Sequence, residues 1–393
     1  MKNILFLTPR IPYPVIGGDR IKSFNLLKHL SSKYNVILVT FYQGKADYFE
    51  YMKEIEKFGI KVYVIKLNPI TKAFEILFKF IGNKPLEILF YFDKRYKSVV
   101  DKILKENKID ISFAFFMRTA EYLIKKDVPK VLIAEDCRKL YQYRSFKESN
   151  SILQKLVRWW EFKKLSEYET KTMAYFDLVT FVTNKDIAEI NKNEPIINTG
   201  LLTNGTNIID FEIDNSLERK GLLFVGKLDL WANQMMIEKI VKYVMPELIK
   251  KYPDILFSVV GANPPQSLYK IENKNVKIYA DVPDIFKFYQ RNSIFMHPHE
   301  GATGIQNKLL EAMAAGLAVV STNTGIQGIN GVNGEHFLVS INIQDFKSKV
   351  LQLLGNPELT REMGMKARQL IIDTHSWKPV FSRLDEIIEK YAK

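Results

Sequence analysis

The sequence IFMHPHEGATGIQNKLLEAMAAGLAVVS, residues 294–321, decides the fold class of this 393-residue chain. It begins with an apolar run at 294–296, continues through a glycine-rich loop into a helical pattern between Gly304 and Gly316, and ends in a second apolar run at 318–321. Apolar runs that alternate with helices predict parallel strands joined by crossover helices, with both faces of the sheet buried. We therefore expect an α/β fold around this unit.

The same alternation extends through the rest of the chain in two series. Further apolar runs that predict strands lie at 3–8, 36–41, 62–67, 111–116, 131–134 and 178–182, and then at 222–225, 255–260 and 276–279. Helical patterns, such as 235–251, lie between them. Because a chain of this length exceeds what one hydrophobic core usually supports, we predict two facing Rossmann-like domains with parallel sheets. An interdomain cleft at the carboxyl ends of the strands would bind the ligands.

A turn-rich segment, Asn204-Gly205-Thr206-Asn207, lies between the two series and predicts the hinge. We place the N-terminal domain at residues 1–204 and the C-terminal domain at 205–377. The tail from Trp377 to Tyr391 has a helical pattern, and the sequence leaves open whether the helix 378–393 joins the first domain. Closure about the hinge is expected to assemble the site and to exclude water.

Composition indicates a globular protein of a reducing compartment. Hydrophobic residues make up 47% of the chain and charged residues 26%, which is close to the average for globular proteins. The single cysteine, Cys137, cannot form an intramolecular disulfide, and the N-terminal sequence is not typical of a signal peptide. No apolar run reaches the roughly 18 residues of a membrane span. We expect a cytoplasmic protein, with any membrane contact peripheral and at the inner face of the cytoplasmic membrane.

Positive charge is concentrated in the first half of the chain. Residues 1–200 contain 35 Lys and Arg against 23 Asp and Glu, whereas the remainder contains 22 against 21. A basic half attracts a membrane surface, nucleic acid or a phosphorylated substrate, although it is also compatible with an ordinary soluble surface. Residues 70–96 combine aromatic and basic side chains and predict peripheral membrane contact, or else helices whose aromatics fill the core. No nucleic-acid-binding module is evident, so we expect no nucleic-acid partner.

The segment from Gly304 to Gly316 carries the strongest chemical signal. Backbone N–H groups at a helix N-terminus attract phosphate, and Gly304 would let a diphosphate approach closely. Lys308 and Glu311 are three residues apart and share a helix face. A cation for phosphate beside a carboxylate for ribose hydroxyls suits a nucleotide-sugar, whereas a surface ion pair is the simpler alternative.

This stretch resembles the donor-binding signature of family 4 of the retaining glycosyltransferases, which have the GT-B fold, and within it a subgroup associated with exopolysaccharide synthesis. The resemblance implies that Glu311 holds the donor ribose. Thr303 stands where the family usually has a first glutamate that contacts the donor sugar. The donor-binding positions implied along this segment are Thr303, Gly304, Ile305, Gln306, Lys308 and Glu311.

Other segments extend the resemblance over most of the chain. Phe224-Val225-Gly226-Lys227 resembles the family's strand followed by Gly-Lys, which implies that Lys227 binds donor phosphate. Asn233 and Lys308 are candidates to replace a second basic residue of the family. Gly17 and Gly18 resemble the family's Gly-Gly loop, which faces the donor phosphates, although a plain turn is the alternative. Segments 204–207 and 376–377 resemble two further motifs of the family, which indicate its fold rather than its chemistry.

A carboxylate occupies the position where relatives often carry a catalytic or sugar-contacting histidine. Asp136 follows the strand 131–134, and Arg118 follows the preceding strand. We expect Asp136 to contact the acceptor or the sugar, with Arg118 as a partner, whereas helix capping is an equal alternative. The predicted catalytic residues are Asp136, Lys227 and Glu311.

The resemblance implies a retaining hexosyltransferase without a protein nucleophile. The donor would be a nucleotide-sugar, with UDP favoured, and the acceptor a glycan or an undecaprenyl-linked precursor of capsule, O-antigen or another exopolysaccharide. Lys227, Lys308 and helix N–H groups would stabilise the leaving diphosphate. No Asp-x-Asp motif follows a strand, and two histidines as close as His297 and His299 are not typical of a metal site, so we expect neither metal nor cofactor. A nucleotide-sugar epimerase and a non-catalytic GT-B partner subunit, the latter motivated by Thr303, are the alternatives.

Overall fold

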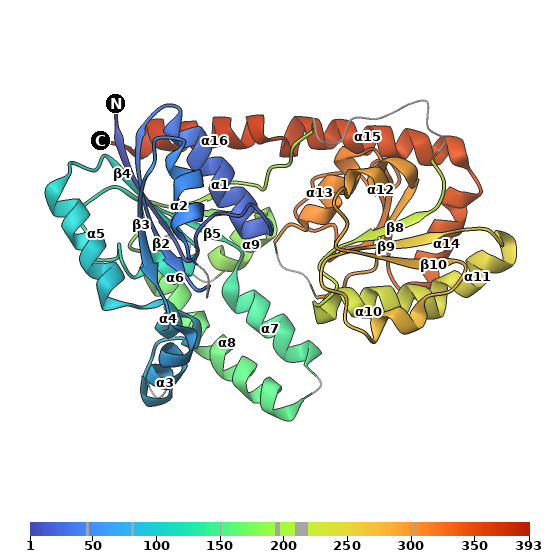
Figure 1. Ribbon diagram of the computed structural model, residues 1–393, viewed down its shortest axis with the longest axis horizontal. Helices are drawn as coiled ribbons and strands as arrows, with labels where there is room; N and C mark the ends of the chain where they lie inside the picture. Colours follow the sequence, from blue (N-terminus) through green and yellow to red (C-terminus); the bar gives the residue numbers. More distant parts are fainter. Residues whose placement is uncertain (45–46, 80–81, 150, 193–196, 209–218, 302–303) are drawn as a thin grey trace. The chain divides into compact units, whose positions relative to one another are not determined.

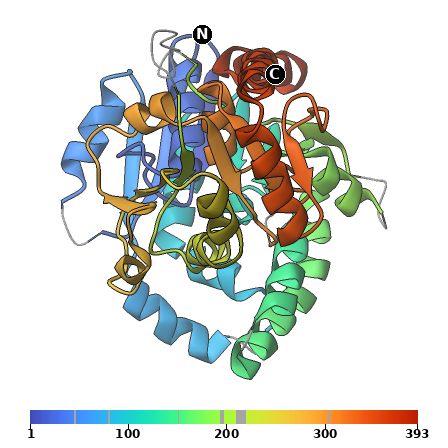
Figure 2. The same cartoon turned by 90° about the vertical axis from the view of Figure 1, so that its right-hand side faces the viewer.

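The computed structural model describes residues 1–44, 47–79, 82–149, 151–192, 197–208, 219–301 and 304–393. The chain divides into two compact units (Figure 1). Unit 1 contains Met1–Thr203 and Phe381–Lys393, and unit 2 contains Asn204–Val380. Each unit is built on one parallel sheet covered by helices, which confirms the prediction of two parallel-sheet α/β domains (Figure 2).

Unit 1 has a seven-stranded sheet in the order β3-β2-β1-β4-β5-β6-β7, with every pair parallel. Its strands are β1 (Asn3–Thr8), β2 (Asn35–Tyr42), β3 (Lys61–Lys66), β4 (Ile111–Phe115), β5 (Lys130–Glu135), β6 (Leu178–Phe181) and β7 (Thr199–Leu201). Its helices are α1 (Gly18–Ser31), α2 (Phe49–Glu56), α3 (Pro69–Lys79), α4 (Leu86–Tyr91), α5 (Lys94–Glu106), α6 (Met117–Ala120), α7 (Arg138–Glu148), α8 (Ile152–Met173) and α9 (Asn184–Asn191).

Unit 2 has a six-stranded parallel sheet in the order β10-β9-β8-β11-β12-β13. Its strands are β8 (Leu222–Val225), β9 (Phe257–Gly261), β10 (Val276–Ala280), β11 (Ile294–His297), β12 (Ala318–Thr322) and β13 (Leu338–Ser340). Its helices are α10 (Trp231–Lys239), α11 (Met245–Lys251), α12 (Phe286–Arg291), α13 (Asn307–Ala314), α14 (Ile343–Leu354) and α15 (Pro357–His375), and α16 (Trp377–Tyr391) runs on into unit 1.

Burial of both sheet faces explains the continuous apolar runs. In β1, Leu5 and Leu7 pack in a cluster with Val100 of α5, while Ile4 and Phe6 on the opposite face are also fully buried. A strand covered on both faces has no polar side, so its sequence shows no alternation. Among the described residues, no helix has the length and apolar character needed to cross a bilayer.

Two features of the fold are not predicted by the sequence patterns. Strands β7 and β13 have only three residues each, which is too short for a periodicity to be recognised. The helix expected over 235–251 contains a π-helical turn at Ile240–Val244, just before Pro246. Because proline has no N–H to donate, the regular hydrogen-bond ladder cannot pass through it, and the preceding turn widens.

The segment after Thr203 is fixed within unit 2 by the end of α15. Thr206 N donates to His375 O at 2.8 Å, and His375 Nδ1 lies 3.1 Å from Asn204 O. Gly205 lies so close to the Trp377 ring that a Cβ atom would meet it. The turn-rich segment is therefore an ordered part of unit 2.

The last part of α16 is fixed on helix α1 of unit 1. The Phe381 ring stacks on His29 with 4.2 Å between centroids. Asp385 accepts from Lys33 at 2.7 Å and lies 2.9 Å from His29 Nε2. The C-terminal residues thus belong to the first sheet's unit, although they follow the second in sequence.

Candidate functional site

Two glycines bring the carboxyl ends of β8 and β9 together with helix α13. A Cβ atom on Gly261 would collide with the Gly226 carbonyl. A Cβ atom on Gly226 would lie 2.9 Å from Asn233 Nδ2 and 3.2 Å from Lys308 Nζ. Only residues without a side chain at these positions allow the strand ends and the two polar side chains to approach so closely.

Lys308 is held by an amide oxygen and not by a carboxylate. Its Nζ donates to Asn233 Oδ1 at 2.6 Å, and Asn233 Nδ2 donates to the Lys227 carbonyl at 2.6 Å. The ammonium also lies 5.1 Å from the centre of the Phe224 ring. Burial lowers the pKa of Lys308 to about 8. Since no described carboxylate forms an ion pair with Lys308, this buried charge is incompletely balanced, which favours an anionic ligand.

Glu311 is fixed by a tyrosine that the sequence motifs did not indicate. Tyr289 Oη donates to Glu311 Oε2 at 2.9 Å, and the Tyr289 ring stacks on Phe295. Burial raises the pKa of Glu311 above its ordinary value. The surface ion pair considered for Lys308 and Glu311 is therefore not formed, and each side chain has its own neutral hydrogen-bond partner.

Burial disfavours the charged form of the two histidines at the end of β11. The Ser321 hydroxyl donates its single proton to His297 O at 3.0 Å, so it accepts from His297 Nδ1, 3.2 Å away. Burial lowers the pKa of His297 well below its ordinary value and that of His299 to about 4. Within the described ranges, no cluster of three or more His, Cys, Asp or Glu side chains could hold a metal ion.

The other residues of the C-terminal half suggested for donor binding are next to this cluster in sequence, apart from one that lies outside the described residues. Lys227 follows β8 with an exposed side chain, and Ile305 is buried. Gly304 has a φ of 67°, in the left-handed region that favours glycine. Gln306 occupies the N-cap position of α13, without a side-chain cap. Thr303 lies outside the described residues.

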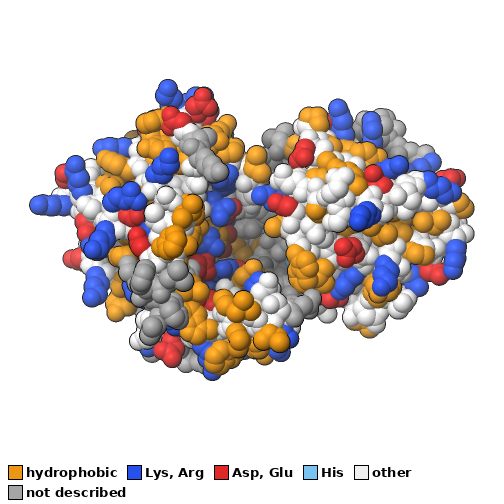
Figure 3. All heavy atoms as spheres, turned by 60° about the horizontal axis from the view of Figure 1, so that its bottom comes forward, with side chains coloured by type: hydrophobic (Ala, Val, Ile, Leu, Met, Phe, Trp, Pro, Cys, Tyr) orange, Lys and Arg blue, Asp and Glu red, His pale blue; other side chains and the backbone are white. Residues whose placement is uncertain are grey.

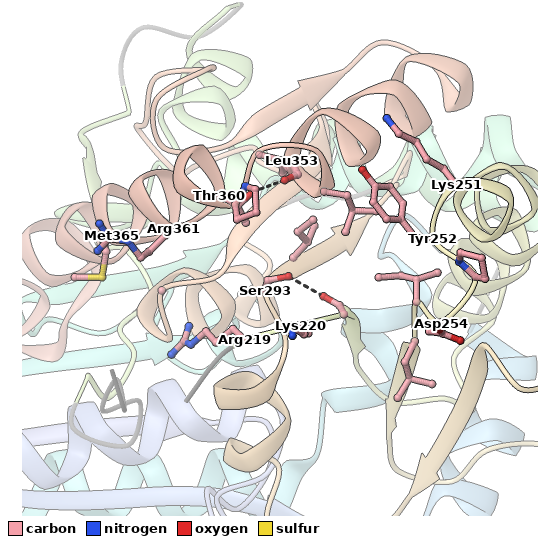
Figure 4. Close-up of a pocket in the computed structure, with 18 residues that line it drawn as sticks. Arg219, Lys220, Lys251, Tyr252, Asp254, Ser293, Leu353, Thr360, Arg361 and Met365 are labelled. Carbon is pink, nitrogen blue, oxygen red and sulfur yellow. Dashed lines mark hydrogen bonds between the residues drawn. The ribbon is translucent and has the colours of Figure 1, made fainter. Parts of the chain in front are cut away.

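A pocket of about 1090 Å³ lies at the opposite, amino-terminal edge of the unit 2 sheet (Figure 4). Gly221 and Ser293, which precede β8 and β11, line it together with Tyr252 and Leu353. None of the residues suggested for donor binding lines this pocket. The polar cluster around Lys308 and this pocket are therefore separate features of unit 2.

In unit 1, Arg118 and Asp136 are joined through two residues that the sequence did not indicate. Arg118 Nε donates to Glu87, and Arg138 Nη2 donates to the second Glu87 oxygen at 2.9 Å. Arg138 Nη1 lies 3.6 Å from Asp136 Oδ2. Burial raises the pKa of Glu87, but the two guanidinium groups outweigh it and hold the pKa below its ordinary value. The result is a chain of alternating charges.

The helix that follows the glycine turn of unit 1 is held by a buried ion pair. Gly17 has a φ of 95°, and Gly18 begins helix α1. One turn later, Lys22 Nζ lies 2.6 Å from Glu135 Oε1 and donates to the Leu202 carbonyl at 2.7 Å. Lys22 therefore connects α1 to the carboxyl ends of β5 and β7.

Backbone strain occurs at the same edge of the sheet. Phe116 and Glu135, which stand at the ends of β4 and β5, have φ values of 64° and 71°. Left-handed conformations of residues other than glycine are costly, and they gather at functional sites. This edge is therefore the candidate functional region of unit 1.

Two carboxylates of helix α8 accept hydrogen bonds from the N-termini of helices α4 and α7. Glu161 accepts from the backbone N–H groups of Leu86 and Glu87, which begin α4. Glu169 accepts from the N–H groups of Arg138 and Lys139 at 2.8 and 3.0 Å. Because a carboxylate at a helix N-terminus satisfies otherwise unpaired donors, α8 fixes the backbone positions of Glu87 and Arg138.

The segment 70–96 divides between the core and the surface. Tyr91 and Tyr96 are buried, as the core-filling interpretation requires, whereas Phe74 is exposed. Lys72 is buried against Glu75 and the Phe92 carbonyl. Ile70 and other exposed side chains of α3 face solvent. The described part of the segment is therefore not a continuous interfacial surface.

Comparison with known proteins gives related chains over the full length. Residues 219–356 match the family described as Glycosyl transferases group 1. A Klebsiella pneumoniae protein described as an uncharacterized 44.6 kDa protein in cps region is 24% identical, with 98% of this chain and 99% of that chain aligned. An uncharacterized glycosyltransferase of Methanocaldococcus jannaschii is 26% identical, with 98% of each chain aligned.

Solved structures share the fold along the whole chain. Sucrose-phosphate synthase from Thermosynechococcus elongatus superimposes with a TM-score of 0.71 at 14% identity, covering 99% of both chains. Anabaena HepE in complex with UDP and glucose gives a TM-score of 0.67 at 15% identity, covering 99% of this chain and 100% of that one. The two parallel-sheet units and the likeness to these structures show a GT-B fold. In sequence, residues 219–356 and the full-length alignments make the chain similar to glycosyltransferases.

Proposed function

We propose that this protein is a retaining hexosyltransferase that transfers a sugar from a UDP-sugar to a glycan or lipid-linked acceptor in surface polysaccharide synthesis, such as capsule or O-antigen. The observation that carries this proposal is the cluster of Lys308, Asn233, Glu311 and Tyr289 at the carboxyl edge of the unit 2 sheet. It offers a buried cation that forms no ion pair with any described carboxylate, three residues before a carboxylate that Tyr289 holds. A diphosphate and the hydroxyls of a ribose are complementary to this pair.

Each residue of the cluster has a role in the proposed reaction. The Lys308 ammonium, the exposed Lys227 side chain and the N–H groups that begin α13 would stabilise the charge that develops on the leaving diphosphate. Glu311 would accept hydrogen bonds from the ribose, with Tyr289 holding its orientation. Gly304, Ile305 and Gln306 would line the donor next to the helix start, and Thr303 would replace the family's first glutamate.

Unit 1 would supply the acceptor side. Asp136 would contact the sugar or the attacking hydroxyl, and Arg138 would hold its carboxylate in place. Arg118 would meet an anionic part of the acceptor, such as a lipid-linked phosphate. Gly17 and Gly18 would approach the donor phosphates with their backbone N–H groups. The acceptor class rests on the relative described in a cps region, and the choice of UDP is supported by the HepE complex with UDP and glucose.

Thermal-shift measurements test the donor part of this proposal. Purified protein would be heated with UDP, GDP and their sugars, with Glu311→Ala as the test variant and Glu335→Ala as an exposed control in the same unit. A ligand at about 100 times its Kd stabilises the folded state by about 2.7 kcal/mol, so we expect a higher melting temperature with UDP-sugars for wild type and control only. No shift with any nucleotide would favour the non-catalytic partner subunit.

Product analysis tests the stereochemistry and the metal requirement. The anomeric configuration of the product, read by NMR after turnover with a UDP-sugar, should match that of the donor. Activity should persist in EDTA, because lysines and helix N–H groups are proposed to stabilise the diphosphate. An inverted product, or activity lost in chelator and restored by Mn²⁺, would contradict these parts of the proposal.

A further inference from the structure

Exposed apolar side chains of unit 1 are concentrated at the tip of the α7–α8 hairpin. Six of the large apolar residues that the described surface exposes lie between residues 143 and 159. Ile152, Leu153 and Leu156 are 79%, 72% and 59% exposed. Scattered exposed apolar residues are normal, whereas contiguous ones mark an interaction surface.

The apolar side chains form a stripe on the first turns of α8. Ile152, Leu153, Leu156 and Val157 follow the spacing that places residues on one helix face. The buried residues of α8, by contrast, begin only at Glu161. The start of α8 therefore extends beyond the body of unit 1, as Figure 1 shows for this hairpin. Within unit 1, no described element covers the stripe.

Basic and aromatic side chains border the stripe. Residues 151–164 contain four Lys and Arg and one acidic residue, Glu161, which is occupied in capping α4. Lys163 and Lys164 lie over the rings of Trp159 and Trp160, at 5.8 and 3.6 Å from the ring centres. Figure 3 shows hydrophobic side chains and Lys and Arg side chains intermixed on the face that it brings forward.

We propose that the hairpin tip, defined as Tyr143, Lys147 and residues 151–164, docks on an anionic membrane surface. Aliphatic side chains at the end of a helix enter the acyl boundary, tryptophans favour the headgroup level, and cations pair with lipid phosphates. A second copy of the chain would cover the stripe as well, but a symmetric contact would bring two basic faces together. The positive charge of the tip therefore favours an anionic membrane over a second copy of the chain as its partner.

Vesicle flotation of the full-length protein tests this proposal without any turnover. The probes are phosphatidylcholine vesicles with and without 30% phosphatidylglycerol, and the apolar variant is Leu153→Ser with Leu156→Ser. Its matched control is Val332→Ser with Ile341→Ser, which changes exposed apolar residues of unit 2. We expect wild type and control to float with anionic vesicles only, and the apolar variant to bind about tenfold or more weakly.

A charge variant separates the electrostatic contribution. Lys155→Gln with Arg158→Gln should weaken binding to anionic vesicles about tenfold or more, whereas Lys57→Gln with Lys102→Gln, two exposed lysines elsewhere in unit 1, should not. Unchanged melting temperatures would show that the variants remain folded. Vesicle binding that is absent in wild type, or that survives both hairpin variants, would overturn the proposal. Conversion of a wild-type dimer to a monomer by these variants would assign the tip to a second copy of the chain instead.

Discussion

The two sheets carry polar residues at the same edge but balance their charges differently. In unit 1, Lys22 is paired with Glu135, and Glu87 lies between Arg118 and Arg138. In the described part of unit 2, Lys308 donates to an amide oxygen and lies over a ring face, and the Glu311 carboxylate acts on it without forming an ion pair. The first edge is a network of ion pairs, whereas the second holds a buried cation that forms no ion pair with any described carboxylate.

This difference indicates that the paired charges of unit 1 position neighbouring elements, whereas the Lys308 charge of unit 2 is available to bind a ligand. A buried charge that is paired with an opposite charge of the protein is already balanced without a ligand. Removing that charge leaves its partner buried and uncompensated. A buried charge without one gains most when a ligand supplies the anion. We therefore expect substitutions in the Lys22–Glu135 ion pair of unit 1 to change mainly stability, and substitutions around Lys308 to change mainly nucleotide affinity.

The largest effect is expected from Lys22→Met. The substitution leaves Glu135 buried without its cation, which typically costs about 3–5 kcal/mol. Thermal unfolding followed by circular dichroism should show a clearly lower midpoint, while UDP should still raise that midpoint by the wild-type increment. In Lys22→Met with Glu135→Leu, much of the stability should return. If Lys22→Met alone melted at the wild-type temperature, the ion pair would not stabilise unit 1.

A smaller effect is expected from Gly226→Ala. The new methyl group would meet Asn233 Nδ2 at 2.9 Å and Lys308 Nζ at 3.2 Å, both at the ends of side chains that can move. Displacing them should weaken UDP binding about tenfold, with a smaller loss of melting temperature than Lys22→Met shows. Calorimetric titration measures the affinity, and unchanged affinity would mean that the Lys308 position is not used by the ligand.

An effect of the same size as that of Gly226→Ala is a dependence of UDP-sugar affinity on pH. The pKa of Lys308 is lowered to about 8 by burial, and a bound phosphate favours the charged ammonium, so the pKa rises on binding. Affinity should therefore be constant below pH 8 and fall above it, by about tenfold between pH 7 and pH 9. Lys308→Arg, which stays charged, should lack this part of the decline. An identical decline in both proteins would assign it to the ligand.

Local sequence patterns predicted helix α13 of unit 2 and its polar face, but they did not predict which side chains of other elements contact that face. The spacing of Lys308 and Glu311 places both on one face of α13, and the glycines before and after that helix mark its limits. Tyr289 lies on another helix, 22 residues before Glu311, and no short motif connects them. Side chains that meet through the sheet order are visible only once the strands are assembled.

The same limit applies more strongly in unit 1. Lys22 meets Leu202 across 180 residues, and Glu87 meets Arg138 across 51. From the sequence, Arg118 and Asp136 were proposed as partners because both follow neighbouring strands. The residues that connect them come from the starts of α4 and α7, and their positions depend on capping by α8.

The most direct test of the account compares UDP with uridine in calorimetric titrations of wild type and Lys308→Met. If Lys308 supplies the charge for the diphosphate, the variant should bind UDP about 10- to 100-fold more weakly, as expected for one charge-assisted hydrogen bond, and should bind uridine as wild type does. Equal UDP affinity in the two proteins would contradict the claim that unit 2 holds a cation reserved for the donor phosphates.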